Sequence, residues 1–313
     1  MLQFHDITLE DRAWMQPLLE ASGMLGNDYA FPNIYNWRFA FNTQAAHLDG
    51  FLVLRFGENG QFFLYPAGSG DVRPVIEAML ANAAENGLRF IMRSVETSAV
   101  ERLAQLYPGR FVFTEDRDSF DYVYSREKLA SLSGKKLHHK RTAIHHFLDE
   151  CPDWSYEPIT EENLPECLKM NDEWCRLNHC FSGGDERHAV DLQNASAALD
   201  NDLGLEHCAV RNALLNFFAL DMLGGMLRVN GRVVAITAGE RHNGNSVLVN
   251  VEKAFLEPDG CYAMINNQFA KNLPDDVLYI NREDDVGDEG LRQSKLSYKP
   301  DLLVEKYTVT LSE

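Results

Sequence analysis

The sequence has no apolar run approaching the ~18 residues that a membrane-spanning helix needs. It also has no recognisable signal peptide at its start. Its six cysteines form no CxxC pair and show no spacing typical of a metal finger. We therefore expect a soluble, cytoplasmic protein whose thiols are reduced and which holds no metal.

Positive charge is scarce. The chain has 29 Lys and Arg against 47 Asp and Glu, a net charge of −18. This balance argues against general electrostatic adhesion to nucleic acid or to an anionic membrane, since both are polyanions. Contact with nucleic acid needs a local basic patch, and transient contact with a membrane surface is left open on the same condition.

One strongly basic run stands out from this acidic background, and it covers residues 135–141. Its cations are Lys135, Lys136, Lys140 and Arg141. A solvated helix face is one interpretation of the run. The contrast with the rest of the chain favours contact with phosphate groups. The histidines at positions 138, 139, 145 and 146 have no carboxylate or cysteine spaced with them as metal ligands.

With 313 residues and 45% apolar residues, the chain is long enough for two domains with cores of their own. We predict an N-terminal domain over residues 1–130, a basic helical connector over 131–150 and a C-terminal domain over 151–313. The aromatic segment 31–38 is interpreted as core packing of the first domain rather than as a ligand-stacking site.

Apolar periodicity and turn residues predict the order of the elements. In the first half we expect strand 2–9, helix 10–22, hairpin 50–65, helix 71–86, strand 88–95, helix 98–107 and strands 110–114 and 119–124, followed by helices over 127–150. In the second half we expect strand 154–159, helices 160–177 and 186–201, hairpin 224–239 turning at Asn230-Gly231, strand 246–254, helix 261–272 and a closing strand 302–311.

The stretch 277–300 holds the densest group of chemically versatile residues. A short strand at 277–280 leads through an acidic loop, with Glu283, Asp284 and Asp285, into a helix over residues 289–298. Ligands of α/β sheets usually bind where a strand gives way to a helix. Arg292, Lys295 and Lys299 share one face of that helix. Acidic residues that complement the helix dipole, beside a solvated cationic face, are the alternative interpretation.

Four segments carry a resemblance to a known family. They are residues 31–37 (FPNIYNW), 132–141 (LSGKKLHHKR), 281–287 (NREDDVG) and 290–300 (GLRQSKLSYKP). In them the chain resembles the C-terminal domain of phosphatidylglycerol lysyltransferase and its short soluble relatives, which are similar to the Fem-type aminoacyl transferases. The resemblance implies an α/β (α+β) fold of tandem GNAT-like domains, each a mixed, mostly antiparallel sheet flanked by helices.

By analogy, the resemblance implies transfer of an aminoacyl group from aminoacyl-tRNA to an amine or hydroxyl acceptor. The loop 257–263 (EPDGCYA) departs from the glycine-rich loop with which GNAT enzymes bind acetyl-CoA, so we expect no acetyl-CoA and no other cofactor. The large membrane domain of the lysyltransferase has no counterpart in this sequence. The acceptor therefore stays open between a lipid and another molecule.

In this interpretation the catalytic candidates are Asp284 and Asp285, as proton acceptors, and Glu252 on the central strand. A structural role for Glu252, as a buried carboxylate, is an equal alternative. Arg292 and Lys295 are candidates for binding phosphate or stabilising an oxyanion. Asn281, Glu283 and Tyr298 complete the substrate-binding candidates, together with the basic run for a tRNA acceptor stem. The alternatives are a non-catalytic, degenerate GNAT pair that binds a small anionic or amino-acid ligand, and an acyltransferase with a donor other than tRNA.

Overall fold

The computed structural model describes residues 2–180 and 202–312. The helix predicted for residues 186–201 lies outside the described residues. The chain divides into two compact units. Unit 1 consists of Met1–Tyr122, Glu283–Glu289 and Leu303–Glu313, and unit 2 consists of Val123–Arg282 and Gly290–Leu302.

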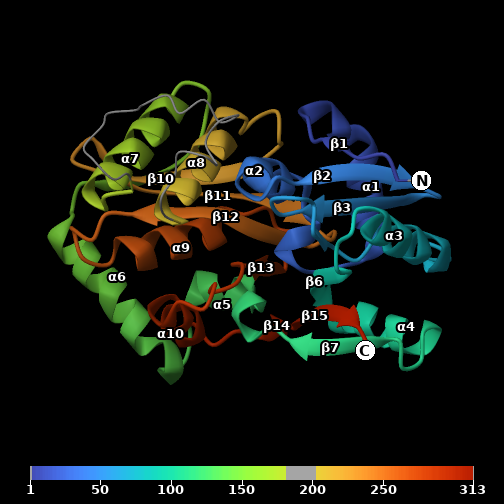
Figure 1. Cartoon of the computed structure of the whole chain (residues 1–313). Coiled ribbons are helices and arrows are strands. Elements are labelled where there is room, and N and C mark those ends of the chain that lie inside the picture. The colour runs from blue at the N-terminus through green and yellow to red at the C-terminus, as the bar shows by residue number, and fades with distance from the viewer. Residues whose placement is uncertain (1, 181–201, 313) are drawn as a thin grey trace. The chain divides into compact units, whose positions relative to one another are not determined.

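The described strands of unit 1 form an eight-stranded sheet in the order β1-β2-β3-β4-β6-β15-β7, with β5 paired to β3 (Figure 1). Only the pair β4–β6 is parallel among these described strands. The elements are β1 (His5–Asp6), η1 (Leu9–Asp11), α1 (Arg12–Ser22), η2 (Asn27–Tyr29), α2 (Phe31–Phe41), β2 (Gln44–Leu48), β3 (Phe51–Phe56), β4 (Phe62–Phe63), β5 (Ala67–Gly68), α3 (Arg73–Glu85), β6 (Ile91–Glu96), α4 (Thr97–Leu106), β7 (Phe111–Glu115), η3 (Arg117–Ser119) and β15 (Lys306–Leu311).

The second sheet has the order β14-β8-β13-β12-β11-β10-β9. Helices α7 and α8 lie on one face of its central strands and α9 lies on the other (Figure 1). Its elements are β8 (Asp121–Ser125), α5 (Arg126–Ser131), η4 (Lys135–Leu137), α6 (His138–Glu150), β9 (Trp154–Pro158), α7 (Leu164–Leu177), α8 (Asp202–Leu215), β10 (Leu223–Val229), β11 (Arg232–His242), β12 (Ser246–Ala254), α9 (Cys261–Asn272), β13 (Tyr279–Asn281), α10 (Glu289–Ser297) and β14 (Leu302–Val304).

The predicted fold class is confirmed: the described residues form an α/β protein with two mixed, mostly antiparallel sheets flanked by helices. Local signals located several elements. Asn230 and Gly231 both have positive φ at the turn between β10 and β11, as a two-residue hairpin requires. The aromatic segment that begins at Phe31 forms α2, and its residues Phe31, Ile34 and Tyr35 are buried as predicted.

The end of the chain differs from its prediction. Residues 302–311 were predicted to be one strand closing the second sheet, but they form two strands, β14 in the second sheet and β15 between β6 and β7 in the first. Alternation along this segment predicts that Leu303, Tyr307 and Val309 share one face of the strand. However, the register shifts between Tyr307 and Val309, and the buried side chains are those of Val304, Lys306 and Val309. An alternating pattern identifies a strand without identifying its sheet.

The domain boundaries proposed from sequence, at residues 130 and 150, stay a prediction. All six cysteines are buried and free. Among the described residues, no helix combines the length and the apolar character needed to cross a membrane.

The pair β12–β13 positions the candidate site. These two strands run parallel and pair only from Ser246↔Tyr279 to Leu248↔Asn281, whereas β12 continues to Ala254. By this register, the C-terminal half of β12 has no described backbone partner on the β13 side. Side chains from the ends of both strands and from α9 converge there, as is usual at the carboxyl ends of parallel strands.

Candidate functional site

A buried ion pair joins the two parallel strands. Glu252 lies near the end of β12, and Arg282 follows β13 directly. Nη2 of Arg282 lies 2.6 Å from Oε1 of Glu252, and their side chains are only 10% and 13% exposed. Burial lowers the pKa of Arg282, but the charge of Glu252 outweighs it and holds the pKa above its usual value. The guanidinium is therefore charged whenever the site works.

Polar atoms around this pair are left without a partner. Asn266 on α9 donates from Nδ2 to Oε2 of Glu252 over 3.1 Å. Its Oδ1 is buried and has no hydrogen-bond partner among the described residues, and the same holds for Nη1 of Arg282 and for Oγ1 of Thr237. Thr237 is the cross-strand partner of Glu252 on β11. Buried polar groups are normally satisfied, so these atoms have hydrogen-bonding capacity that the described residues do not use.

Two tyrosines and a lysine enclose the arginine. The guanidinium carbon of Arg282 lies 4.9 Å from the ring centroid of Tyr298 and 5.9 Å from that of Tyr124. Nζ of Lys140 lies 4.0 Å from the ring centroid of Tyr298. Burial and the charge of Arg282 lower the pKa of Lys140 to about 8, although Glu252 opposes this shift. Burial raises the pKa of Tyr298 to about 12, so its hydroxyl is neutral.

Lys295 fixes the backbone beneath the pair. Its Nζ donates to the carbonyl of Arg282 over 2.6 Å, and the hydroxyl of Tyr124 donates to the carbonyl of Lys295 over 2.7 Å. Lys295 is itself buried. The rings of Tyr124 and Tyr298 meet edge to face at 6.3 Å. Helix α10 thus holds the end of β13 in place, which fixes the direction of the Arg282 side chain.

The acidic loop belongs to unit 1. Asp285 is fully buried, and its Oδ2 accepts from the hydroxyl of Tyr122 at 2.5 Å and from Arg117 at 3.3 Å. Its Oδ1 accepts from the backbone N–H of Gly287 at 3.0 Å. Asp285 therefore holds the loop in shape. Glu283 and Asp284 are half-buried in the same loop. The proton-acceptor role of Asp284 or Asp285 stays a prediction.

Of the residues predicted from sequence, the structure brings together Glu252, Lys140, Tyr298 and Lys295 around Arg282. Asn281 is buried at the end of β13, and Arg292 is half-buried on α10. Lys299 lies beyond the end of α10 with a positive φ and is exposed, so it does not continue the predicted face of Arg292 and Lys295.

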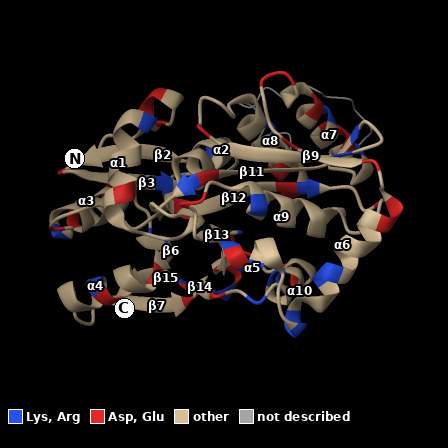
Figure 2. Ribbon diagram, turned by 180° about the vertical axis from the view of Figure 1, so that it is seen from behind, with Lys and Arg blue, Asp and Glu red and all other residues tan. Residues whose placement is uncertain are grey.

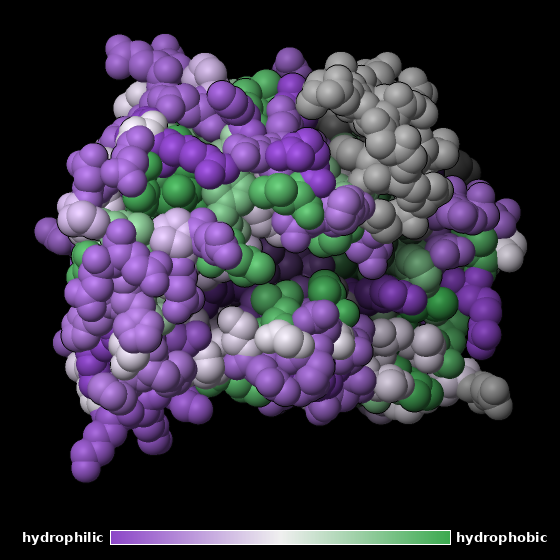
Figure 3. Space-filling model, turned by 90° about the vertical axis from the view of Figure 1, so that its left-hand side faces the viewer, coloured by the Kyte–Doolittle hydropathy of each residue, from purple (hydrophilic) through white to green (hydrophobic). Residues whose placement is uncertain are grey.

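The basic run divides between different environments. Lys135 and Lys136 are exposed on η4, whereas Lys140 points to the buried cluster. Arg141 donates to the carbonyls of Leu132 and Gly134. Figure 2 shows cationic residues on α6 and near α10. The face seen in Figure 3, which includes the side where α6 lies, is mainly hydrophilic, with hydrophobic residues in small groups.

Sequence reasoning missed Arg282, Asn266, Thr237 and Tyr124. Arg282 belongs to the segment 281–287 that carried the resemblance, but its charge there looked like part of a solvated acidic loop. Its partner Glu252 lies 30 positions earlier, across α9, and only the parallel pairing of β12 with β13 brings the two together. A cation directly after a short strand, next to a central-strand carboxylate, is the signal that could have found the pair.

The family described as phosphatidylglycerol lysyltransferase, C-terminal, matches residues 21–310. The chain belongs to this family. The membership indicates an acyltransferase-type function.

Similar proteins and structures bear on the fold. A conserved protein of unknown function from Bacteroides thetaiotaomicron VPI-5482 is 40% identical, with a TM-score of 0.89 and 100% of both chains covered. The structure of L-PGS from Bacillus licheniformis is 16% identical, with a TM-score of 0.62, covering 96% of this chain and 91% of that one. An uncharacterised protein of Mycoplasmoides gallisepticum is 25% identical over 193 residues, 61% of this chain; the match spans only 56% of that relative's length.

Proposed function

We propose that unit 2 transfers an aminoacyl group from aminoacyl-tRNA to an amine or hydroxyl acceptor. The observation that carries this proposal is the buried pair of Glu252 and Arg282, where the donor Nη1 of Arg282 and the acceptor Oδ1 of the neighbouring Asn266 are both unpartnered among the described residues. An aminoacyl ester offers the complementary groups: a carbonyl oxygen that accepts and an α-ammonium that donates.

Each group of the substrate has a partner of matching charge. Nη1 of Arg282 donates to the ester carbonyl and stabilises the negative charge that develops on its oxygen during attack. The α-ammonium donates to Glu252 and to Oδ1 of Asn266. Since Glu252 also orients Arg282, the carboxylate fixes both ends of the aminoacyl group relative to the acceptor.

The attacking group must lose a proton, and the 3′-oxygen of the tRNA must gain one. Lys140 has a pKa of about 8, well below that of an ordinary lysine, which suits a group that takes the proton from the acceptor and passes it to the leaving oxygen. The bond from the carbonyl carbon to the acceptor forms, and the bond to the tRNA oxygen breaks. Asp284, Asp285 and Glu252 remain the alternative proton acceptors, and the pH profile described in the Discussion separates them from Lys140.

The environment of α9 supports a donor other than acetyl-CoA. In GNAT enzymes a pyrophosphate binds at the N-terminus of the helix that follows the central strand. Here Gly260 precedes α9 with a φ of +84°, and α6 lies so close that a Cβ on Gly260 would meet the carbonyl oxygen of Ala143 at 2.3 Å. A backbone carbonyl at this position repels a phosphate. The exposed Lys135 and Lys136 on η4, directly before α6, offer contacts to a tRNA backbone.

A non-catalytic binding role is the second candidate, because the same unpartnered atoms fit a free amino acid. The carboxylate of the amino acid would accept a hydrogen bond from Nη1 of Arg282, and its ammonium would donate to Asn266 and Glu252. Under this reading, a ligand binds and the Arg282→Met variant abolishes binding, but no donor gives turnover.

The test is a transfer assay with radiolabelled bulk aminoacyl-tRNA, deacylated tRNA and acetyl-CoA, at low and high salt. Vesicles containing phosphatidylglycerol and a panel of small amines serve as acceptors. The proposal predicts salt-sensitive binding of aminoacyl-tRNA and transfer of the label to one acceptor. Absence of tRNA binding at low salt rejects a tRNA donor. Binding of free amino acids without transfer favours the second candidate.

A further inference from the structure

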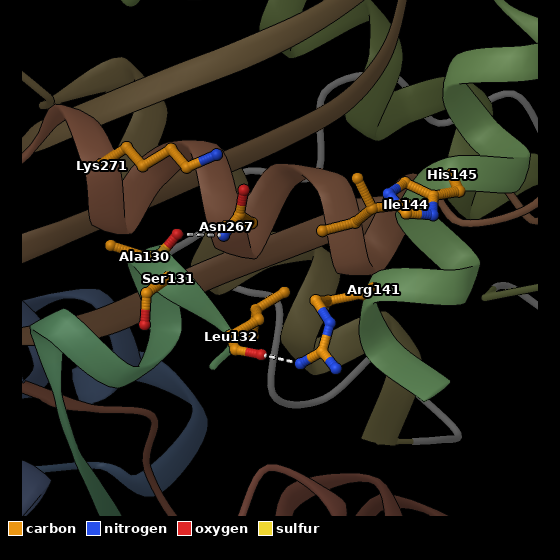
Figure 4. A pocket seen from close by; sticks show the side chains of 8 residues that line it. All are labelled: Ala130, Ser131, Leu132, Arg141, Ile144, His145, Asn267 and Lys271. Atoms are coloured by element: carbon orange, nitrogen blue, oxygen red, sulfur yellow. Dashed lines mark hydrogen bonds between the residues drawn. The ribbon is translucent and has the colours of Figure 1, made fainter. Parts of the chain in front are cut away.

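Unit 2 contains a small cavity of about 120 Å³ in addition to the Glu252–Arg282 cluster. It lies among α5, α6 and α9 (Figure 4). Its lining consists of Ala130, Ser131, Leu132, Arg141, Ile144, His145, Asn267 and Lys271. Sites for whole small molecules measure roughly 300–1,000 Å³, so this cavity suits a single chemical group of a larger ligand.

The lining carries positive charge without a carboxylate. Arg141 and Lys271 are cations, His145 is a third group that can carry charge, and no acidic residue lines the cavity. Within the described part of the chain, neither Arg141 nor Lys271 forms an ion pair. Other half-buried arginines of this acidic protein do form one, such as Arg228, which pairs with Glu157 and Glu166. This charge is therefore left for an external anion.

The carbonyls that would repel an anion are already bonded. Nδ2 of Asn267 donates to the carbonyls of Leu129 and Ala130 at 2.7 and 2.8 Å. Nη1 of Arg141 donates to the carbonyls of Leu132 and Gly134, as the dashed line in Figure 4 marks for Leu132. These bonds hold the guanidinium in place, and its Nε and Nη2 have no partner among the described residues.

We propose that this cavity binds a phosphate group and, resting on the proposed function, that the phosphate belongs to the backbone of the nucleic-acid donor. Helix α6 links the cavity to the candidate site. Lys140 contacts Tyr298 at the site, and the next residue, Arg141, lines the cavity. Successive helical residues point about 100° apart, so one helix presents a cation to each location. A guanidinium fork matches phosphate oxygens in two parallel hydrogen bonds.

The test uses Lys271→Glu, because Lys271 is exposed and its side chain forms no described hydrogen bond, so the fold survives its replacement. Lys169→Glu on α7 is the matched control, since it changes the net charge equally at an exposed position away from the cavity. Filter binding of deacylated bulk tRNA is measured over a salt series for both variants and for the unaltered protein. Inorganic phosphate is titrated separately into each by calorimetry.

We expect Lys271→Glu to weaken tRNA binding about tenfold and to make the dependence of log K on log salt shallower by about 0.7–0.9, as loss of one phosphate contact does. Lys169→Glu should leave the slope unchanged. Equal affinity and slope for Lys271→Glu and the unaltered protein would overturn the cavity assignment while leaving the proposed donor intact. If the unaltered protein binds no tRNA but binds inorganic phosphate through Lys271, the cavity is a site for free phosphate and the tRNA donor fails.

Discussion

Each unit contains a buried network of charges, and the two networks differ in whether their members satisfy one another. In unit 1, Nζ of the fully buried Lys306 donates to Asp28 and Asp121, each at 2.8 Å, and to Asn27. All three of its protons are used. In unit 2, Arg282 pairs with Glu252 but keeps Nη1 unpartnered among the described residues.

The difference separates structural from functional charge. Oδ2 of Asp121 accepts the N–H of Asn27, and Oε1 of Glu96 accepts the N–H groups of Leu25 and Gly26. The unit 1 network therefore ties a loop to the sheet and has little hydrogen-bonding capacity left for a ligand. The unit 2 network has buried capacity to spare, which costs stability unless a ligand uses it. Replacing the central cation of each network should separate these effects.

The largest expected effect belongs to Lys306. Lys306→Met leaves the fully buried Asp121 and the half-buried Asp28 without their cation, so we expect the free energy of unfolding to fall by about 3–5 kcal/mol. Urea denaturation measures it, with Lys169→Met as an exposed control. A loss below about 1 kcal/mol would contradict a structural role for this network.

The next effect is on catalysis. Arg282→Met should reduce aminoacyl transfer by about 10²–10³-fold, because it removes the donor that stabilises the carbonyl oxygen. The loss should appear in kcat/KM and not merely in KM. Arg241→Met is the control. Arg241 lies on β11 of the same sheet as the site and forms an exposed ion pair with Asp276. Equal activity of the two variants would remove Arg282 from the reaction.

Lys140 should control the pH dependence of transfer. If it is the proton acceptor, the rate rises with pH up to about 8, where the ammonium of the unaltered protein loses its proton. Lys140→Arg keeps the charge and cannot act as a base near neutral pH, so we expect about 10²-fold slower transfer and no inflection near pH 8. An unchanged profile in this variant would transfer the role to Asp284, Asp285 or Glu252.

The smallest effect is an opposite pH dependence of stability in the two units. Burial raises the pKa of Glu96 from 4.5 to about 7, so the folded state binds the proton of this carboxyl more tightly than the unfolded state does. The stability that this proton contributes is lost as pH rises from 4.5 through 7. Burial lowers the pKa of His207 from 6.5 to about 4, so its folded state disfavours the proton, and stability falls as pH drops from 6.5 through 4.

Glu96→Gln and His207→Gln test these signs against the unaltered protein. As pH rises from about 5.5 to 7.5, the titration of Glu96 should lower the free energy of unfolding by about 2 kcal/mol. Over the same range, the titration of His207 should raise it by about 1 kcal/mol. The stability difference between Glu96→Gln and the unaltered protein should therefore grow with pH in favour of the variant. For His207→Gln the trend should be the reverse. Denaturation at both pH values decides, and parallel curves would show that neither group titrates in this way.

Much of the fold follows from local signals, and much of the site does not. The turn at Asn230-Gly231 and the reciprocal bonds of Thr8 and Asp11 at the first helix depend on neighbours in sequence, and both were predictable. Glu252 was identified because it lies on a central strand. Its partner Arg282 could not be, because a charge in an acidic loop resembles a solvated one until strand pairing buries it. Lys306 was not identified either, because a lysine in a strand looks exposed until strand pairing buries it.

The position of β15 has a consequence for how the protein is made. This strand lies between β6 and β7 in unit 1, yet it follows every strand of unit 2 in the chain. During synthesis from the N-terminus, unit 2 is nearly complete before unit 1 receives an inner strand and the lysine that neutralises Asp28 and Asp121. Until then β6 and β7 present unpaired edges to other chains. A fragment that ends before β15 would keep those edges unpaired. Unit 1 is therefore complete only after unit 2 has been synthesised, even though each unit has its own sheet.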